Sequence, residues 1–262
     1  MLATLQRSKT RRGASYREVG QGEPLVLIHG VGMRLEAWEP QMASLSETHR
    51  VIAVDMPGHG GSVALDRGSL LPEFVGWLGG VLDDLELDAV NVAGHSMGAL
   101  IAGGAAASFG SRVSRVALLN GVYRRSPEAR AAVSARAREI AEGGQVDFDG
   151  PLRRWFSEGA ENETAYRLTR SWLSNVDPFG YATAYAAFAQ GDETYADAWG
   201  RVDCPALFVT GDGDPNSTPA MAAAMAKAAP KGECAIIEGH RHMVNLTAPE
   251  QVNRLLAHWL RR

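Results

Sequence analysis

Residues 89–98 read AVNVAGHSMG, and this stretch decides the fold. The apolar run 89–93 is typical of a buried strand, and a helical pattern continues from 97 to 109. Between them stands the pattern Gly94-x-Ser96-x-Gly98, in which a sharp strand-to-helix turn holds the serine hydroxyl clear of the sheet. Side chains at positions 94 and 98 would collide with this turn, so glycine is favoured at both. The stretch therefore predicts a nucleophilic serine, Ser96, at the carboxyl end of a strand.

Short apolar runs on either side of this stretch alternate with helical patterns. Strands are expected at 25–29, 51–55, 89–93, 113–119, 206–210 and 234–238, after an opening hairpin of 2–7 and 14–19. Helices are expected at 37–46, 70–85, 97–109, 219–229 and 249–260. Apolar runs this short suit strands that are buried on both faces. The alternation predicts an α/β fold with a doubly wound, mostly parallel sheet and a site at the carboxyl ends of its strands.

The segment 121–203 interrupts this alternation, because it contains helical patterns but no convincing buried strand. It also holds 12 of the 19 aromatic residues of the chain. Structureless loops of this length are rare, so we expect a helical cap over a core made of residues 1–120 and 204–262. Most of these aromatic side chains are expected to form the cap's own core, and those that face the sheet are expected to line a substrate pocket. The candidates are Trp155, Trp172, Phe179 and Tyr185.

A serine hydroxyl becomes an effective nucleophile only when a base accepts its proton. His242 is the preferred base, because it lies in a loop between a predicted strand and the helix that Pro249 opens. His240 is its rival. His95 precedes the serine, but its side chain is expected to point away from the hydroxyl at so sharp a turn. Motif position therefore selects the base among the histidines.

An acid has to orient the imidazole and stabilise its charged form. Asp212 and Asp214 both follow the predicted strand 206–210, and either could instead serve only to form the turn. The chain order of serine, aspartate and histidine is the one expected when G-x-S-x-G carries the nucleophile. The sequence thus contains a complete Ser–His–Asp set.

The oxyanion that forms when a serine attacks a carbonyl needs N–H donors that are fixed in place beforehand. One donor is expected to be the backbone N–H of Met97, at the start of the helix after the serine. The second is expected from the loop 29–32, with Val31 preferred and Gly32 as the alternative. This chemistry requires no metal ion and no organic cofactor.

The composition narrows the partners. Lys and Arg total 26 against 30 Asp and Glu, and the net charge of −4 makes nucleic acid an unsuitable partner. No stretch is long and apolar enough for a membrane span, and the N-terminal residues lack the apolar core of a signal peptide. Cys204 and Cys234 belong to no motif and are expected to be reduced. We expect a cytoplasmic protein with a small-molecule substrate and no membrane partner, and the sequence leaves a homodimer open.

Five motifs, in order, resemble those of the α/β-hydrolase superfamily. They are His29-Gly30, the run 55–62 (DMPGHGGS), Gly94–Gly98, the turn with Asp214, and the run 242–246 (HMVNL). The resemblance implies an α/β-hydrolase fold with a helical cap. It selects Asp214 over Asp212, because the superfamily's aspartate stands three residues after the glycine of its turn. It also selects His242, although Arg241 replaces the second glycine of the superfamily's G-x-G-H pattern.

The resemblance implies a serine esterase or lactonase that cleaves a carboxylic ester or lactone through an acyl-enzyme. Ser96 excludes those relatives that use aspartate as the nucleophile. Small esterases, enol-lactonases of the oxoadipate type and N-acyl-homoserine lactonases fit the motifs. The alternatives are C–N or C–C hydrolysis by the same triad, or ligand binding without turnover. A substrate carboxylate could be bound by an arginine of the cap, which carries Arg124, Arg125, Arg153, Arg154, Arg167 and Arg170.

Overall fold

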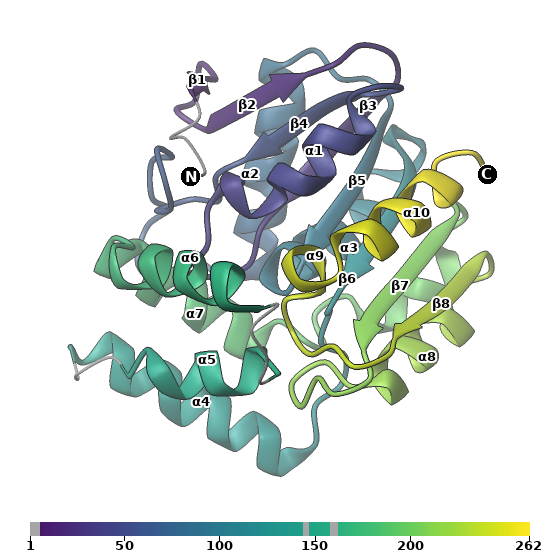
Figure 1. The fold of residues 1–262 in the computed structure, drawn as a ribbon. Coiled ribbons are helices and arrows are strands. Elements are labelled where there is room, and N and C mark those ends of the chain that lie inside the picture. Colours follow the sequence, from purple (N-terminus) through teal and green to yellow (C-terminus); the bar gives the residue numbers. More distant parts are fainter. Residues whose placement is uncertain (1–5, 144–146, 158–161) are drawn as a thin grey trace.

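A mixed sheet of eight strands runs through the described part of the molecule (Figure 1). The computed structural model describes residues 6–143, 147–157 and 162–262, and the sheet has the order β1-β2-β4-β3-β5-β6-β7-β8. β2 is antiparallel to β1 and β4, and all other pairs are parallel. The strands are β1 (Ser8–Lys9), β2 (Ser15–Val19), β3 (Pro24–Ile28), β4 (Arg50–Val54), β5 (Val90–His95), β6 (Val113–Leu119), β7 (Ala206–Gly211) and β8 (Gly232–Ile237). The predicted mostly parallel α/β sheet is confirmed.

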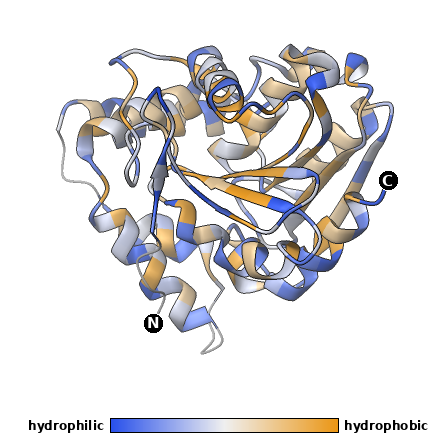
Figure 2. Cartoon of the chain, turned by 90° about the horizontal axis from the view of Figure 1, so that it is seen from above, coloured by the Kyte–Doolittle hydropathy of each residue, from blue (hydrophilic) through white to orange (hydrophobic). Residues whose placement is uncertain are grey.

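Helices cover both faces of the sheet, because neighbouring residues of a strand point to opposite sides. On β3, Leu25 and Leu27 pack in one apolar cluster, and Val26 and Ile28 pack in the other. The first cluster includes η1 (Leu35–Trp38), α1 (Glu39–Leu45), α9 (Val244–Thr247) and α10 (Pro249–Trp259), and the second includes α2 (Leu71–Asp84), α3 (Met97–Ser108) and α8 (Pro219–Ala228). Figure 2 shows apolar strands between these layers. No helix in the described ranges is long and apolar enough to cross a membrane.

The described part of the opening hairpin differs from the prediction in its first strand. That strand is Ser8–Lys9, residues 6 and 7 of the predicted strand 2–7 are not in a strand, and residues 2–5 lie outside the described residues. Arg7 does not extend the strand. Its guanidinium instead bonds to the carboxylates of Asp55 at 2.7 Å and Glu36 at 2.6 Å. Residue 7 is thus bonded to residues that are distant in the chain, and the local pattern does not contain these partners.

The segment between β6 and β7 contains helices and loops, and no strand, wherever the structure describes it. The inserted helices are α4 (Pro127–Ala141), α5 (Asp149–Trp155), α6 (Glu163–Ser174), α7 (Pro178–Gln190) and η4 (Ala196–Arg201). Figure 1 shows α4 to α7 gathered at one end of the sheet. Leu173 and Tyr181 share an apolar cluster with Met33 and Met243 from the core loops. Trp199, near the end of the insertion, packs on the sheet itself.

Candidate active site

Ser96 occupies a strained turn between β5 and α3. Its φ of 55° and ψ of −114° are rare for a residue with a side chain, and its N–H donates to the Leu119 carbonyl at 2.9 Å. A Cβ at Gly94 would lie 1.9 Å from the Gly98 carbonyl oxygen, and a Cβ at Gly98 would lie 2.1 Å from the Ile28 carbonyl oxygen. The two glycines are therefore a steric requirement of the turn that presents the serine.

His242 and Asp214 form a buried pair near this turn. The imidazole Nδ1–H donates to the Asp214 carboxylate at 2.8 Å, and the exposed fractions of the two residues are 3% and 2%. The same carboxylate also accepts bonds from the Asn120 side chain at 2.8 Å and the Asn216 N–H at 2.8 Å. Burial alone would raise the pKa of Asp214, but His242 and these donors outweigh it and hold the pKa below its ordinary value. The carboxylate is thus kept ionised beside the imidazole.

The rival residues have other partners. The His240 Nδ1 lies 2.9 Å from the Thr247 hydroxyl. The Asp212 carboxylate accepts the Gly239 N–H at 2.9 Å, which links the loop after β7 to the loop after β8. Only Asp214 forms a hydrogen bond with His242 among the described carboxylates.

The backbone of His242 is held from two sides. The Nε2–H of His95 donates to the His242 carbonyl at 2.7 Å, and the His242 N–H donates to the Trp155 carbonyl at 3.1 Å. Burial lowers the pKa of His95 to about 3, so this second imidazole is neutral. The side chain of His95 thus supports the backbone of the loop 238–243, which we call the histidine loop. This contact fits the expectation that the His95 side chain points away from the serine.

The loop 29–32 packs against the serine. A Cβ at Gly30 would lie 3.0 Å from the Ser96 Cβ. The Gly32 N–H donates to Nε2 of His59 at 2.9 Å, and the opposite ring nitrogen of His59 donates to the Pro57 carbonyl at 3.0 Å. No described group accepts the Val31 N–H. Of the two donors considered from the sequence, the N–H of Val31 is therefore the one that is free.

The N–H of Met97 is the other candidate donor. Met97 is the first residue of α3, and the first N–H groups of a helix have no partner within it. The helix dipole adds partial positive charge at this end. The N–H groups of Met97 and Val31 are thus the two candidate donors for a negatively charged oxygen.

The four aromatic candidates lie in different surroundings. The Trp155 ring stacks on His242, with 5.7 Å between ring centroids and 29° between planes. Tyr185 is half-buried beside Tyr181, at 5.8 Å between centroids. Trp172 is buried in the apolar cluster of the inserted helices, whereas Phe179 is 41% exposed. Trp155 is thus the candidate that contacts the predicted base.

Tyr181 was not selected from the sequence, yet it contacts the loop 29–32. A Cβ at Gly32 would lie 3.2 Å from the Tyr181 ring and 2.4 Å from the Leu173 side chain. In the sequence, nothing distinguishes Tyr181 from the other aromatic residues of the insertion. Its contact with the loop 29–32 depends on how α6 and α7 pack in three dimensions.

The structure separates the arginines of the insertion by their partners. Arg125 pairs with the buried Asp192 at 3.0 Å, and Arg170 pairs with Asp149 at 3.2 Å. Of the others, two are paired with carboxylates, namely Arg124 with Asp197 and Arg167 with Glu163. Arg153 and Arg154 form no salt bridge with a described residue.

Arg154 also acts electrostatically on the tyrosine pair. Burial raises the pKa of Tyr185, and the positive charges of Arg136 and Arg154 oppose this rise. The same two charges oppose the rise in the pKa of Tyr181 that its burial causes. Since Arg136 bonds to Glu139 at 2.6 Å, Arg154 is the cation of this pair without a carboxylate partner in the described residues.

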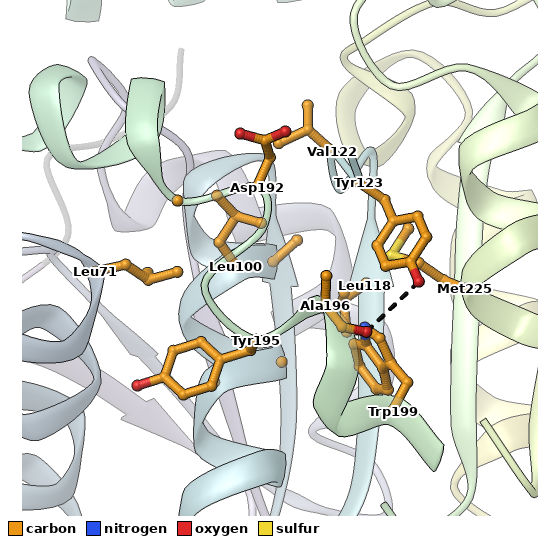
Figure 3. Close-up of a pocket in the computed structure, with 14 residues that line it drawn as sticks. Leu71, Leu100, Leu118, Val122, Tyr123, Asp192, Tyr195, Ala196, Trp199 and Met225 are labelled. Atoms are coloured by element: carbon orange, nitrogen blue, oxygen red, sulfur yellow. Dashed lines mark hydrogen bonds between the residues drawn. The ribbon is translucent and has the colours of Figure 1, made fainter. Parts of the chain in front are cut away.

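A cavity beside α3 does not belong to this site. Figure 3 shows its walls, which include Leu100, Tyr123 and Trp199, and a bond of 3.5 Å from the Tyr123 hydroxyl to the Ala196 carbonyl. Its volume of about 20 Å³ suits a single water molecule. Ser96 does not line it, so we interpret it as a packing space between α3 and the insertion.

The fold and the strained serine turn are those of a hydrolase, and comparison with known proteins agrees. The model of the alpha/beta hydrolase family matches residues 25–255, so the chain belongs to this family. It is 50% identical over 257 residues to the (E)-2-((N-methylformamido)methylene)succinate hydrolase of Acinetobacter baylyi, covering 98% of this chain and 97% of that protein.

Two solved structures are also similar. One is a thermophilic esterase from Thermogutta terrifontis with bound malate, with a TM-score of 0.88, 25% identity and 98% of each chain covered. The other is the enol-lactonase from Burkholderia xenovorans LB400, with a TM-score of 0.83, 26% identity, and 98% and 100% of the chains covered.

Proposed function

We propose that this alpha/beta hydrolase cleaves the C–N bond of an N-acylated enamine that carries two carboxylates. The identity of 50% to the Acinetobacter enzyme along nearly the whole chain carries the proposal. The substrate in that enzyme's name has a formamide group and a succinate. A carbonyl for Ser96 to attack and carboxylates for arginine to bind are therefore present in one small molecule.

In the proposed reaction Ser96 Oγ attacks the formyl carbon while His242 takes the hydroxyl proton. Asp214 orients the imidazole and stabilises its charged form. The N–H groups of Val31 and Met97 hold the oxyanion. His242 then gives the proton to the leaving nitrogen, the C–N bond breaks, and a formyl ester of Ser96 remains. Water, deprotonated by His242, attacks this ester, and formate leaves as the serine regains its proton.

Arg154 is our candidate for binding a substrate carboxylate. It lies next to Trp155 at the end of α5, and its charge reaches the tyrosine pair near the loop 29–32. An arginine without a carboxylate partner can form two parallel bonds to a carboxylate of the substrate. The buried Arg125, by contrast, is neutralised by Asp192.

Hydrolysis of an ester or lactone is the second candidate function. The similarity to an esterase and an enol-lactonase along the whole chain favours it. The Ser–His–Asp chemistry is the same for both candidates, so the substrate has to distinguish them.

The test is the initial rate of formate release from (E)-2-((N-methylformamido)methylene)succinate, beside rates on p-nitrophenyl acetate and an enol-lactone. Ser96→Ala should lower the rate at least about a thousandfold, whereas the exposed control Ser111→Ala should not change it. Turnover by Ser96→Ala would refute the mechanism. Ester or lactone turnover without formate release would select the second candidate.

The carboxylate contact has its own test. Arg154→Met should raise KM for the succinate about tenfold or more and leave p-nitrophenyl acetate hydrolysis unchanged. The matched control is Arg153→Met, since Arg153 is an exposed neighbour on the same helix. Equal effects of the two variants would refute the assignment.

A further inference from the structure

The histidine loop is hydrogen-bonded to the end of α5. Arg241 Nη1 donates to the Arg153 carbonyl at 2.9 Å and to the Phe156 carbonyl at 3.2 Å. The N–H of His242 donates to the Trp155 carbonyl at 3.1 Å. The last carbonyls of a helix lack partners within it and favour a nearby cation. The guanidinium of Arg241 therefore caps α5 and holds the helix on the loop that carries the histidine.

The bonds between Arg241 and the end of α5 hold the Trp155 ring against the imidazole of His242. The Trp155 and His242 rings stack at 5.7 Å between centroids, and His95 lies at 5.1 Å in a tilted arrangement. When the imidazole accepts the serine proton it becomes a cation, and an indole face within about 6 Å attracts a cation. His95 is neutral, and Asp214 is the charged side chain hydrogen-bonded to the ring.

We propose that Trp155 stabilises the imidazolium form of His242 in the transition state, and that Arg241 is the positioning residue that holds Trp155 there. The proposal rests on the function proposed above, since it requires His242 to act as the base. It also gives a role to the arginine that replaces the glycine of the superfamily pattern. A glycine at 241 has no side chain with which to cap α5.

The first experiment compares Trp155→Leu with Trp155→Phe, on whichever substrate of the panel the wild type turns over fastest. Trp155→Leu should lower kcat about 3- to 30-fold and move the acid limb of the kcat/KM profile to lower pH. Trp155→Phe keeps an aromatic face and should retain most of the rate. Equal rates for the two variants, or an effect on KM alone, would overturn the proposal.

The second experiment is a double-mutant cycle. Arg241→Met should reproduce the loss in kcat of Trp155→Leu, and the double variant should lose less than the product of the single losses, because Arg241 acts through Trp155. Arg241→Lys provides a second variant that keeps a donor. The exposed Arg138→Met is the control. Fully additive losses would overturn the role of Arg241.

An NMR measurement separates this proposal from the proposed function. The ring current of Trp155 should shift the imidazole ¹H resonances of His242 upfield. This shift should disappear in Trp155→Leu and shrink in Arg241→Met, without any substrate present. Unchanged resonances would refute the stacking, whereas activity in Ser96→Ala would refute the serine mechanism and leave the stacking intact.

Discussion

Replacement of His59 by alanine would test how the loop 29–32 is held. His59 is 1% exposed, and its ring links the Gly32 N–H to the Pro57 carbonyl through bonds of 2.9 and 3.0 Å. Alanine leaves the buried Gly32 N–H without an acceptor, which costs about 1–3 kcal/mol. Loss of the second bond and the space left by the ring add to this cost. We expect the free energy of unfolding to fall by about 3 kcal/mol.

The loss in activity should exceed what this destabilisation alone produces. Gly32 follows Val31, whose N–H is the candidate oxyanion donor, and removal of one such donor typically lowers kcat about 10²- to 10³-fold. His59→Ala displaces the loop but does not remove the donor, so we expect kcat to fall at least about 30-fold. KM should change less, because the oxyanion exists only after attack.

The assay combines steady-state rates with urea unfolding at the same pH. His59→Gln carries an amide oxygen that can accept the Gly32 N–H, so part of kcat should return. His49→Ala is the control, because His49 lies in a surface turn beside Thr48. A folded His59→Ala enzyme with wild-type kcat would refute the reasoning, as would an equal loss in His49→Ala.

Three further perturbations follow from the same contacts. Gly98→Ala should not yield folded protein, judged by circular dichroism, because its Cβ would lie 2.1 Å from the Ile28 carbonyl oxygen. Burial lowers the pKa of both His29 and His95 to about 3, so unfolding, which frees them to bind protons, should become easier as pH falls below about 6.5. The free energy of unfolding, measured by urea titration, should therefore fall from about pH 6.5 to pH 5 by up to about 1.4 kcal/mol per pH unit for each histidine, and a constant value would contradict this. Asp192→Ala should lower the unfolding free energy by about 3 kcal/mol in the same assay, because a buried arginine loses its partner, and an unchanged value would refute that.

The strained turn that carries Ser96 could be predicted from the sequence because its cause is local. Gly94 and Gly98 are required by atoms within the turn and the neighbouring strand. The chain order of Ser96, Asp214 and His242 can be read directly from the sequence. Because parallel strands end at one edge of a sheet, the loops that carry these residues are predicted to lie together. Their geometry still required the structure, since Asp212 lies only two residues from Asp214 and faces the Gly239 N–H instead.

Contacts between segments that are distant in the chain could not be predicted. The bond from Asn120 to Asp214 joins the end of β6 to the loop after β7, and no motif marks Asn120. The bond from Gly32 to His59 likewise depends on how two loops meet. Arg241 was visible only as a departure from a glycine pattern, and its partners on α5 appear only in three dimensions.

These long-range contacts bear on substrate choice. The Ser–His–Asp chemistry serves esters, lactones and amides alike, so in our proposal the inserted helices select among them. In this chain the insertion contacts both halves of the proposed machinery, with Trp155 on His242 and Tyr181 beside Gly32. In the proposed site, side chains that border the substrate would therefore also position the base and the oxyanion donors. We accordingly expect substitutions at these contacts to change kcat together with KM.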